Sequence, residues 1–243
     1  MPRETIRRIS LWSGPRNVST ALMCSFAQRS DTKVFDEPLY AHYLKNSPAK
    51  YYHPGAIEIL ATMENDGSKV VEMMLKSSEK PVLFFKNMTH HILGLDLKFT
   101  NNIVNVLLTR DPKEMLPSFD KVIPNPKMRD VGYKFHSDLV SYFERYSIDY
   151  AVLDSKNLLL NPERVLKRLC SKIEIPFDKN MLQWAAGKIK EDGIWAEYWY
   201  NSIHKSVGFA PYSEKTEAFP ARLIPLLKEC KSHYERLLDQ AIA

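Results

Sequence analysis

Ser13-Gly14-Pro15-Arg16-Asn17-Val18-Ser19-Thr20 is the stretch of this 243-residue sequence that decides the fold. The segment before it, 6–12, has the apolar and aromatic bulk of a β-strand. After it, Val18, Leu22 and Phe26 recur every four residues, as they do along a helix. A strand, a short Gly-Pro loop and a helix start form an anion site, because the first N–H groups of a helix lack partners and the positive end of its dipole faces outward.

The side chains of this loop favour a phosphate-like ligand. Arg16 contributes a planar guanidinium that fits phosphate or sulfate oxygens, and Ser19 and Thr20 add hydroxyl donors. The standard nucleotide-triphosphate loop requires a Gly-Lys pair, and here Asn17 and Val18 stand where a glycine is expected. The loop therefore predicts an anion site that is not an ATP–Mg²⁺ site by default, with an ordinary β–α turn as the alternative. The residues predicted to bind the ligand here are Gly14, Pro15, Arg16, Asn17, Val18, Ser19 and Thr20.

The composition excludes several classes of protein. Apolar residues make up 44% of the chain, enough for a substantial core, and no apolar run approaches a membrane span. The net charge of +5 is spread along the chain, which favours a small anionic ligand over nucleic acid. The three scattered cysteines form no metal spacing or disulfide framework, and the N-terminus is charged rather than apolar. We therefore expect a cytoplasmic protein with no metal, nucleic-acid or membrane partner; its oligomeric state is not readable.

Apolar runs alternate with helical patterns along the chain. Such alternation predicts an α/β fold with three layers, α/β/α, around a mainly parallel central sheet. We expect one domain over residues 1–243, with an irregular, aromatic-rich cap at 39–54. The predicted strands are 6–12, 31–35, 81–86, 103–109 and, as the last one, 150–153; the predicted helices include 54–63, 69–75, 179–187 and 220–241.

Two further helices have recognisable start signals. Asp111 is a good N-cap, Pro112 suits the first helical position, and Glu114 has the spacing of a capping box. Asn161 and Pro162 make the same kind of start for the next helix. Both helices follow predicted strands, as expected for strand–helix units.

Polar side chains follow four of these elements. They are the loop 14–20, Asp36 and Glu37, the group 86–91, and Arg110. In open α/β sheets, ligands bind beyond the carboxyl ends of the strands. The sequence therefore gathers these groups at one edge of the sheet, as a single candidate site.

These motifs resemble those of the sulfotransferase family. The loop 13–20 resembles its 5′-phosphosulfate loop, with Arg16, Ser19 and Thr20 on the basic and hydroxyl positions. A strand ending at Arg110, with Ser118 eight residues later, resembles its 3′-phosphate motif. The resemblance covers about residues 6–176. The chain is also similar to uncharacterised sulfotransferase-like proteins, some of which carry an aminotransferase label, although no pyridoxal-phosphate signature is visible.

The resemblance implies a P-loop NTPase-like sulfotransferase fold. It implies 3′-phosphoadenosine-5′-phosphosulfate (PAPS) as the donor cosubstrate and transfer of a sulfuryl group to a hydroxyl or amine of a small acceptor, without a metal. Arg16 and the loop N–H groups suit the charge that develops on the leaving phosphate. Arg110 and Ser118 would bind the 3′-phosphate, and Lys205, in an aromatic loop with Gly208, is a candidate to close over the nucleotide.

The transfer needs a general base, and two kinds of candidate are present. Glu37 resembles the base of a bacterial carbohydrate-sulfotransferase branch. His90 or His91 resembles the histidine of the cytosolic branch, although here Lys86 precedes His90 by four residues rather than two. We rank Glu37 slightly ahead, and Lys86 is a candidate to reach the transferred group.

Two other functions are compatible with these motifs. A small-molecule kinase on the same fold would bind ATP and Mg²⁺, against which the missing Gly-Lys pair argues. A non-catalytic nucleotide-binding domain would keep the donor site without turnover, and the altered spacing of Lys86 and His90 leaves this alternative open.

Overall fold

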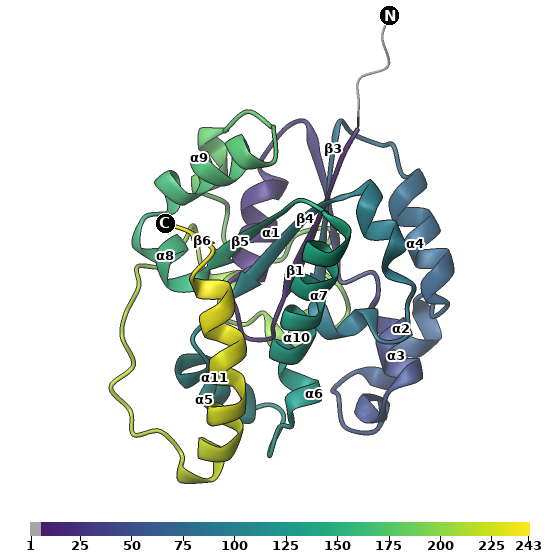
Figure 1. The fold of residues 1–243 in the computed structure, drawn as a ribbon. Coiled ribbons are helices and arrows are strands. Elements are labelled where there is room, and N and C mark those ends of the chain that lie inside the picture. The colour runs from purple at the N-terminus through teal and green to yellow at the C-terminus, as the bar shows by residue number, and fades with distance from the viewer. Residues whose placement is uncertain (1–5) are drawn as a thin grey trace, which may run out of the picture.

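The computed structural model describes residues 6–243 and is built around one six-stranded sheet (Figure 1). The strand order is β2-β3-β1-β4-β5-β6, and every neighbouring pair is parallel. The predicted α/β fold with a parallel sheet is thus confirmed. The strands are β1 (Arg7–Ser13), β2 (Thr32–Asp36), β3 (Val82–Met88), β4 (Val104–Thr109), β5 (Tyr150–Asp154) and β6 (Ala241–Ile242).

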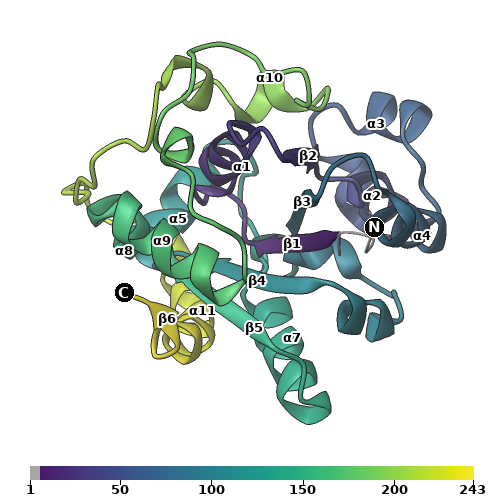
Figure 2. The same cartoon turned by 90° about the horizontal axis from the view of Figure 1, so that it is seen from above.

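Helices cover both faces of this sheet (Figure 2). On one face, α1, α8 and α9 pack on the strands; on the other, α4, α7 and α11 do so. The α-helices are α1 (Ser19–Ala27), α2 (Tyr40–Asn46), α3 (Ala56–Thr62), α4 (Gly67–Lys76), α5 (Pro112–Asp120), α6 (Met128–Val131), α7 (Tyr133–Tyr146), α8 (Ser155–Leu160), α9 (Pro162–Lys172), α10 (Ala196–Trp199) and α11 (Ile224–Leu238). The 3₁₀ helices are η1 (Pro48–Tyr51), η2 (Thr89–Ile92), η3 (Leu97–Asn102), η4 (Lys179–Leu182), η5 (Ile203–Lys205) and η6 (Ala221–Leu223).

The two helical layers explain why the central strands are apolar along their length. Every residue of β3 is buried, and Phe84 stacks on Phe26 of α1, with ring centroids 4.1 Å apart. Phe85 points to the other face and stacks on Phe35. A parallel strand with helices on both sides buries side chains of both orientations, so it reads as a continuous apolar run.

Both predicted helix starts are present, but the capping box is not. Asp111 accepts the Lys113 N–H at 2.8 Å, and Asn161 accepts the Arg164 N–H at 3.1 Å. Glu114 instead accepts hydrogen bonds from the Arg110 guanidinium, at 3.2 and 3.1 Å. A charge-assisted bond to Arg110 is stronger than the one a capping box offers.

Three predicted segments differ from the structure. The helix predicted at 179–187 ends after η4, because Gln183 forms an antiparallel bridge with Gly208 and Trp184 N–H donates to the Val207 carbonyl at 3.1 Å. The segment 39–54 contains α2 and η1 rather than an irregular chain. The buried residues of α2 include Tyr40, His42 and Tyr43 beside Ala41 and Leu44, and this mixture of polar and apolar side chains hides the helical period. The helix predicted at 220–241 is shorter, because 221–223 form η6 and Ala241 belongs to β6.

The strand β6 was missed, so β5 is not the last strand of the sheet. Ala241 and Ile242 pair with Val152 and Leu153 of β5. Two residues are too short a run to carry a strand pattern.

None of the helices within residues 6–243 is sufficiently long and apolar to cross a membrane. The single domain over 1–243 stays a prediction, and residues 1–5 lie outside the described part.

Candidate active site

A cavity of about 290 Å³ lies at the carboxyl ends of β1 to β4. Its volume is near the lower end of the range for small-molecule sites, about 300–1,000 Å³. The expected meeting of polar groups at this sheet edge is confirmed. The residues that line the cavity and were singled out from the sequence are Pro15, Arg16, Asn17, Val18, Ser19, Thr20, Glu37, Lys86, His90, His91, Arg110 and Ser118.

Two predicted residues do not line this cavity. Gly14 packs behind the loop, where an added Cβ would lie 3.2 Å from the Val131 carbonyl oxygen. Lys205 is exposed to solvent, whereas its neighbours Ser202, Ser206 and Gly208 do line the cavity. The loop that carries Lys205 thus reaches the site, but the geometry gives no support to Lys205 itself as a ligand-binding residue.

The loop between β1 and α1 is fixed by Asn17. Its Nδ2 donates to the Leu108 carbonyl of β4 at 2.9 Å, and its Oδ1 accepts from the Val18 N–H and from the Ser155 hydroxyl. Arg16 has a φ of 52°, a left-handed conformation that is costly for a residue with a side chain. These contacts hold the open N-terminus of α1 toward the cavity, where its free N–H groups favour an anion.

Two guanidinium groups stand beside this helix end. Arg16 donates from Nε to the Ser118 hydroxyl at 3.1 Å and from Nη1 to the Trp199 carbonyl at 3.2 Å. Arg110 donates from Nη1 to the Arg16 carbonyl at 2.9 Å and pairs with Glu114. Burial and, to a lesser extent, the charge of Arg110 lower the pKa of Arg16. The close approach of two cations makes this part of the cavity attractive to an anion.

Lys86 lies between two carboxylates at another part of the cavity. The register of β2 and β3 places Asp36 beside Lys86, whose ammonium donates to Asp36 at 2.8 Å and to Glu37 at 2.5 Å. It also donates to the Tyr200 hydroxyl, which in turn donates to Asp36 at 2.8 Å and accepts from the Trp195 indole at 3.1 Å. All five side chains are buried.

This network separates the roles of the two carboxylates. Asp36 accepts hydrogen bonds from Lys86, from Tyr200 at 2.8 Å and from the Gly193 N–H. Glu37 accepts from Lys86 and only at 3.5 Å from Tyr200, and it lines the cavity. Burial raises the pKa of Glu37, and Lys86 partly offsets that effect. Burial alone would lower the pKa of Lys86, but Asp36 and Glu37 outweigh it and raise this pKa. Glu37 is therefore a carboxylate with increased proton affinity in contact with the cavity.

The two histidines considered as bases are buried and packed against aromatic rings. His91 is stacked between the Tyr40 and Tyr43 rings, with centroids 4.8 and 5.0 Å away. Burial lowers the pKa of His90 to about 3 and that of His91 well below 6.5. An imidazole with so low a pKa is a weak base, so the geometry and charge favour Glu37.

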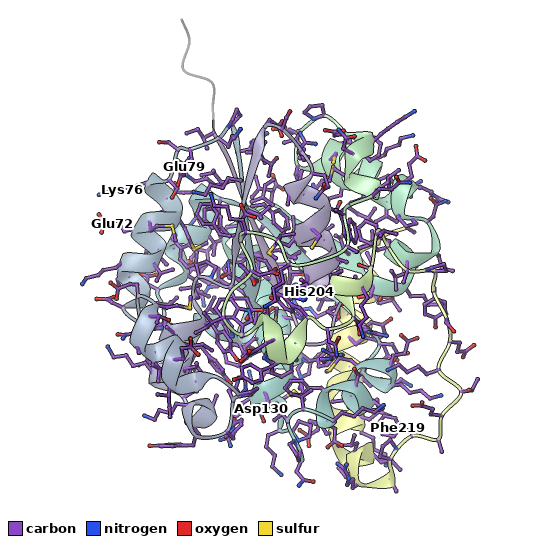
Figure 3. The ribbon with its side chains drawn as sticks, turned by 180° about the vertical axis from the view of Figure 1, so that it is seen from behind. Glu72, Lys76, Glu79, Asp130, His204 and Phe219 are labelled. Atoms are coloured by element: carbon purple, nitrogen blue, oxygen red, sulfur yellow. The ribbon has the colours of Figure 1, made fainter. Side chains whose placement is uncertain are left out.

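The sequence did not identify several residues of this site. Trp199 and Tyr200 belong to the aromatic segment that also carries Lys205, and His53 belongs to the predicted cap at 39–54. Only a clustering of aromatic residues marked these segments. Asp130 also lines the cavity, and the structure shows it at the start of α6 (Figure 3). His204, also labelled in Figure 3, bonds to Asp192 at 2.8 Å on the segment that crosses in front of the sheet.

Comparisons with known proteins give the family of this chain. A family model described as "Sulfotransferase domain" matches residues 7–222. Two Arabidopsis thaliana proteins, branched-chain-amino-acid aminotransferase-like proteins 2 and 1, are 38% and 39% identical over 94% and 93% of this chain. The chain spans only 41% and 42% of their lengths, about two fifths of each relative.

Solved structures share the fold. The sulfotransferase domain of the Synechococcus PCC 7002 olefin synthase has a TM-score of 0.60 at 14% identity, covering 94% of this chain and 96% of that one. The sulfotransferase domain from the curacin biosynthetic pathway has a TM-score of 0.56 at 14% identity, covering 94% and 98%. These likenesses confirm the predicted sulfotransferase-type fold.

The buried histidines predict a loss of stability in acid. Burial lowers the pKa of His53 and of His136 from 6.5 to about 4, so between these pH values the unfolded chain binds more protons than the folded one. The free energy of unfolding should fall as the pH drops below 6.5, by up to about 1.4 kcal/mol per pH unit for each such histidine. Urea unfolding at pH 7 and pH 5 measures this loss.

The variant His136→Gln isolates one contribution. Glutamine can still donate to the Trp12 carbonyl, which the His136 Nε2 contacts at 3.1 Å, but it does not titrate. The variant should lose about 1–2 kcal/mol less than the wild-type protein over the same pH range. Equal losses in the two proteins would show that His136 is not neutral in the fold.

Proposed function

Because the chain belongs to the sulfotransferase family, we propose that it transfers a sulfuryl group from PAPS to a hydroxyl or amine of a small acceptor. The observation that carries this proposal is a single cavity that holds both an anion site and a buried carboxylate. Arg16, Arg110 and the start of α1 provide the former, and Glu37 provides the latter. PAPS carries a 3′-phosphate and a 5′-phosphosulfate, both of which an anion site can bind. The acceptor must lose a proton, which a carboxylate can accept.

The residues near the loop fit such a donor. The N–H groups at the start of α1 and the Arg16 guanidinium would hold the 5′-phosphosulfate end. Arg110 and Ser118, both in contact with Arg16, would hold the 3′-phosphate. A contact to the 3′-phosphate would distinguish this donor from ATP, so it separates sulfuryl transfer from the kinase alternative.

The chemistry needs two charge movements in the same cavity. As the acceptor oxygen bonds to sulfur, Glu37 would accept its proton, and the bond between sulfur and the bridging oxygen of the 5′-phosphate would break. Arg16 would stabilise the negative charge on that departing oxygen, giving 3′,5′-adenosine bisphosphate and the sulfated acceptor. Lys86, which donates to Glu37, would keep the carboxylate oriented and charged.

The names of the two plant relatives raise an aminotransferase as another activity. We do not extend that name to this chain, because it spans only about two fifths of each relative and residues 7–222 match the sulfotransferase domain. A donor-binding domain without turnover is the remaining alternative. The variants below distinguish it from an enzyme.

Arg110→Ala tests the proposed 3′-phosphate contact. Binding of 3′,5′-adenosine bisphosphate should weaken about 10–100-fold, because a hydrogen bond to a charged group contributes about 1.5–3 kcal/mol. Binding of 5′-AMP, which lacks the 3′-phosphate, should change much less. Isothermal titration calorimetry measures both affinities.

Lys113→Ala is the matched control for Arg110→Ala. Lys113 is exposed near the start of α5, three residues after Arg110, so its removal changes the net charge equally without touching the cavity. It should leave both affinities within about threefold, since exposed charges are screened. Equal losses for the bisphosphate and 5′-AMP in Arg110→Ala would remove the proposed role.

Glu37→Gln tests the general base. The variant should bind 3′,5′-adenosine bisphosphate as the wild-type protein does, but its transfer rate should fall by about 10²–10⁴-fold. Transfer of ³⁵S from labelled PAPS measures the rate. Glu197→Gln, an exposed change on α10, is the control. Full activity of Glu37→Gln would return the role to His90 or His91.

Tyr200→Phe tests the role of Glu37 through the pH dependence of kcat/KM. The Tyr200 hydroxyl lies 3.5 Å from Glu37 Oε1, and this contact lowers the pKa of Glu37. Its removal should raise that pKa, so the acid limb of the kcat/KM profile should move to higher pH. An unmoved acid limb would show that Glu37 does not control the rate.

A further inference from the structure

Three histidines line one part of the cavity. His53, His90 and His91 all line it, and they are exposed by only 9%, 2% and 1%. We call these three residues the histidine wall. They come from separate parts of the chain, since His53 follows η1 whereas the other two lie in η2. The proposed sulfuryl transfer uses none of them as its base.

Each residue of the histidine wall has a buried ring nitrogen without a partner. These atoms are His53 Nε2, His90 Nδ1 and His91 Nδ1. A buried polar atom that stays unpaired costs about 1–3 kcal/mol, so such atoms are rare in folded proteins. Of the eight such side-chain atoms within residues 6–243, only these three belong to residues that line the cavity, which favours a bound molecule that supplies hydrogen-bonding groups there.

His53 is held in a fixed position relative to Glu37. The Tyr40 N–H donates to the Glu37 carbonyl at 2.9 Å, and the Tyr40 hydroxyl pairs with His53 Nδ1 at 2.8 Å. Because Nδ1 is occupied in this way, Nε2 is the His53 atom left for a ligand. Tyr40 therefore sets the distance between the proposed base and the unpaired nitrogen.

The rings around the histidine wall are rigidly packed. Tyr43 stacks on His91 and meets His90 edge to face at 4.7 Å. The Trp199 ring lies 6.3 Å from the His53 ring and parallel to Phe119. A preorganised pocket loses little entropy on binding and favours a compact ring.

The charges near the histidine wall disfavour an anionic acceptor. Glu37 and Asp130 line this part of the cavity, and Lys86 is already held by Asp36 and Glu37. The histidines add no positive charge, because burial lowers the pKa of His53 to about 4 and that of His90 to about 3. Neutral imidazoles can donate to or accept from hydroxyl groups.

We propose that the histidine wall is the acceptor subsite and that it takes an uncharged ring carrying at least two hydroxyl groups. One hydroxyl faces Glu37 for transfer, and the second hydrogen-bonds to His53 Nε2. This inference rests on the proposed sulfuryl transfer for the role of Glu37. It adds the chemical class of the acceptor and a residue, His53, that selects it.

Three matched ring compounds test the inference. Resorcinol has two hydroxyls, phenol has one, and 3-hydroxybenzoate replaces the second hydroxyl with a carboxylate. Two equivalent hydroxyls alone would make kcat/KM for resorcinol twice that for phenol. With PAPS as donor, the observed ratio should be at least about tenfold. The value for 3-hydroxybenzoate should be lower than that for resorcinol.

Two substitutions at His53 separate its two nitrogens. His53→Asn keeps a polar group on the side of Nδ1, next to Tyr40, but removes Nε2; His53→Gln places an amide near Nε2. The ratio of kcat/KM for resorcinol to that for phenol should fall to about two in His53→Asn and stay within about threefold of wild type in His53→Gln. His233→Asn, on α11 and paired with Ser137, is the control outside the cavity and should keep the wild-type ratio.

The outcomes distinguish this inference from the proposed function. A wild-type ratio near two, or a ratio that His53→Asn does not change, overturns the acceptor subsite but leaves sulfuryl transfer standing. If no compound is sulfated, the proposed acceptor class is overturned, whereas the proposed function still stands or falls on donor binding. Binding of resorcinol gives a second test of the subsite. Resorcinol titrated into protein saturated with 3′,5′-adenosine bisphosphate should shift the ¹⁵N resonance of His53 Nε2, and phenol should not; no shift with resorcinol overturns the subsite.

Discussion

The buried ammonium of Lys86, held by Asp36 and Glu37, is the interaction on which the site depends. It joins the ends of β2 and β3, and Tyr200 ties it to the segment before η5. Two carboxylates and one ammonium leave an excess of negative charge away from water, which is costly unless one carboxylate gains a proton or the group binds a ligand. The network therefore gives Glu37 an affinity for protons that an exposed glutamate lacks.

Backbone strain supports the same conclusion. Arg16 and Glu37 have φ values of 52° and 45°, and both line the cavity. Each left-handed residue costs about 1–3 kcal/mol, a cost that folded proteins accept chiefly where a side chain must point in one direction. Within residues 6–243, five non-glycine residues have a positive φ, and only these two of the five line the cavity. They are the proposed anion-binding cation, after β1, and the proposed base, after β2.

The sequence predicted the parts of the site that lie close to strand ends. Arg16, Glu37, Lys86 and Arg110 follow apolar runs, and a parallel sheet brings such positions to one edge whatever the details of packing. The fold class followed from the same alternation of strands and helices. The roles of these residues in binding and transfer stay predictions.

The rest of the site was beyond sequence reasoning because it depends on long-range packing. Tyr200 lies 114 positions after Lys86, and no local pattern indicates that their side chains meet. His53 follows η1 in the segment that the sequence predicts as an irregular cap, so no helical period places it at the cavity. The low pKa of the histidines also comes from burial, which depends on tertiary structure.

The central claim is that the cavity binds a donor with a 3′-phosphate and a 5′-phosphosulfate. The most direct measurement is calorimetric titration with 3′,5′-adenosine bisphosphate and, in the same buffer, with ATP–Mg²⁺. Clear binding of the bisphosphate with weak binding of ATP–Mg²⁺ is the predicted result. A preference for ATP–Mg²⁺ would contradict the claim and favour a kinase, and binding of neither would leave the Arg16 loop as a structural turn in a fold shared with sulfotransferases.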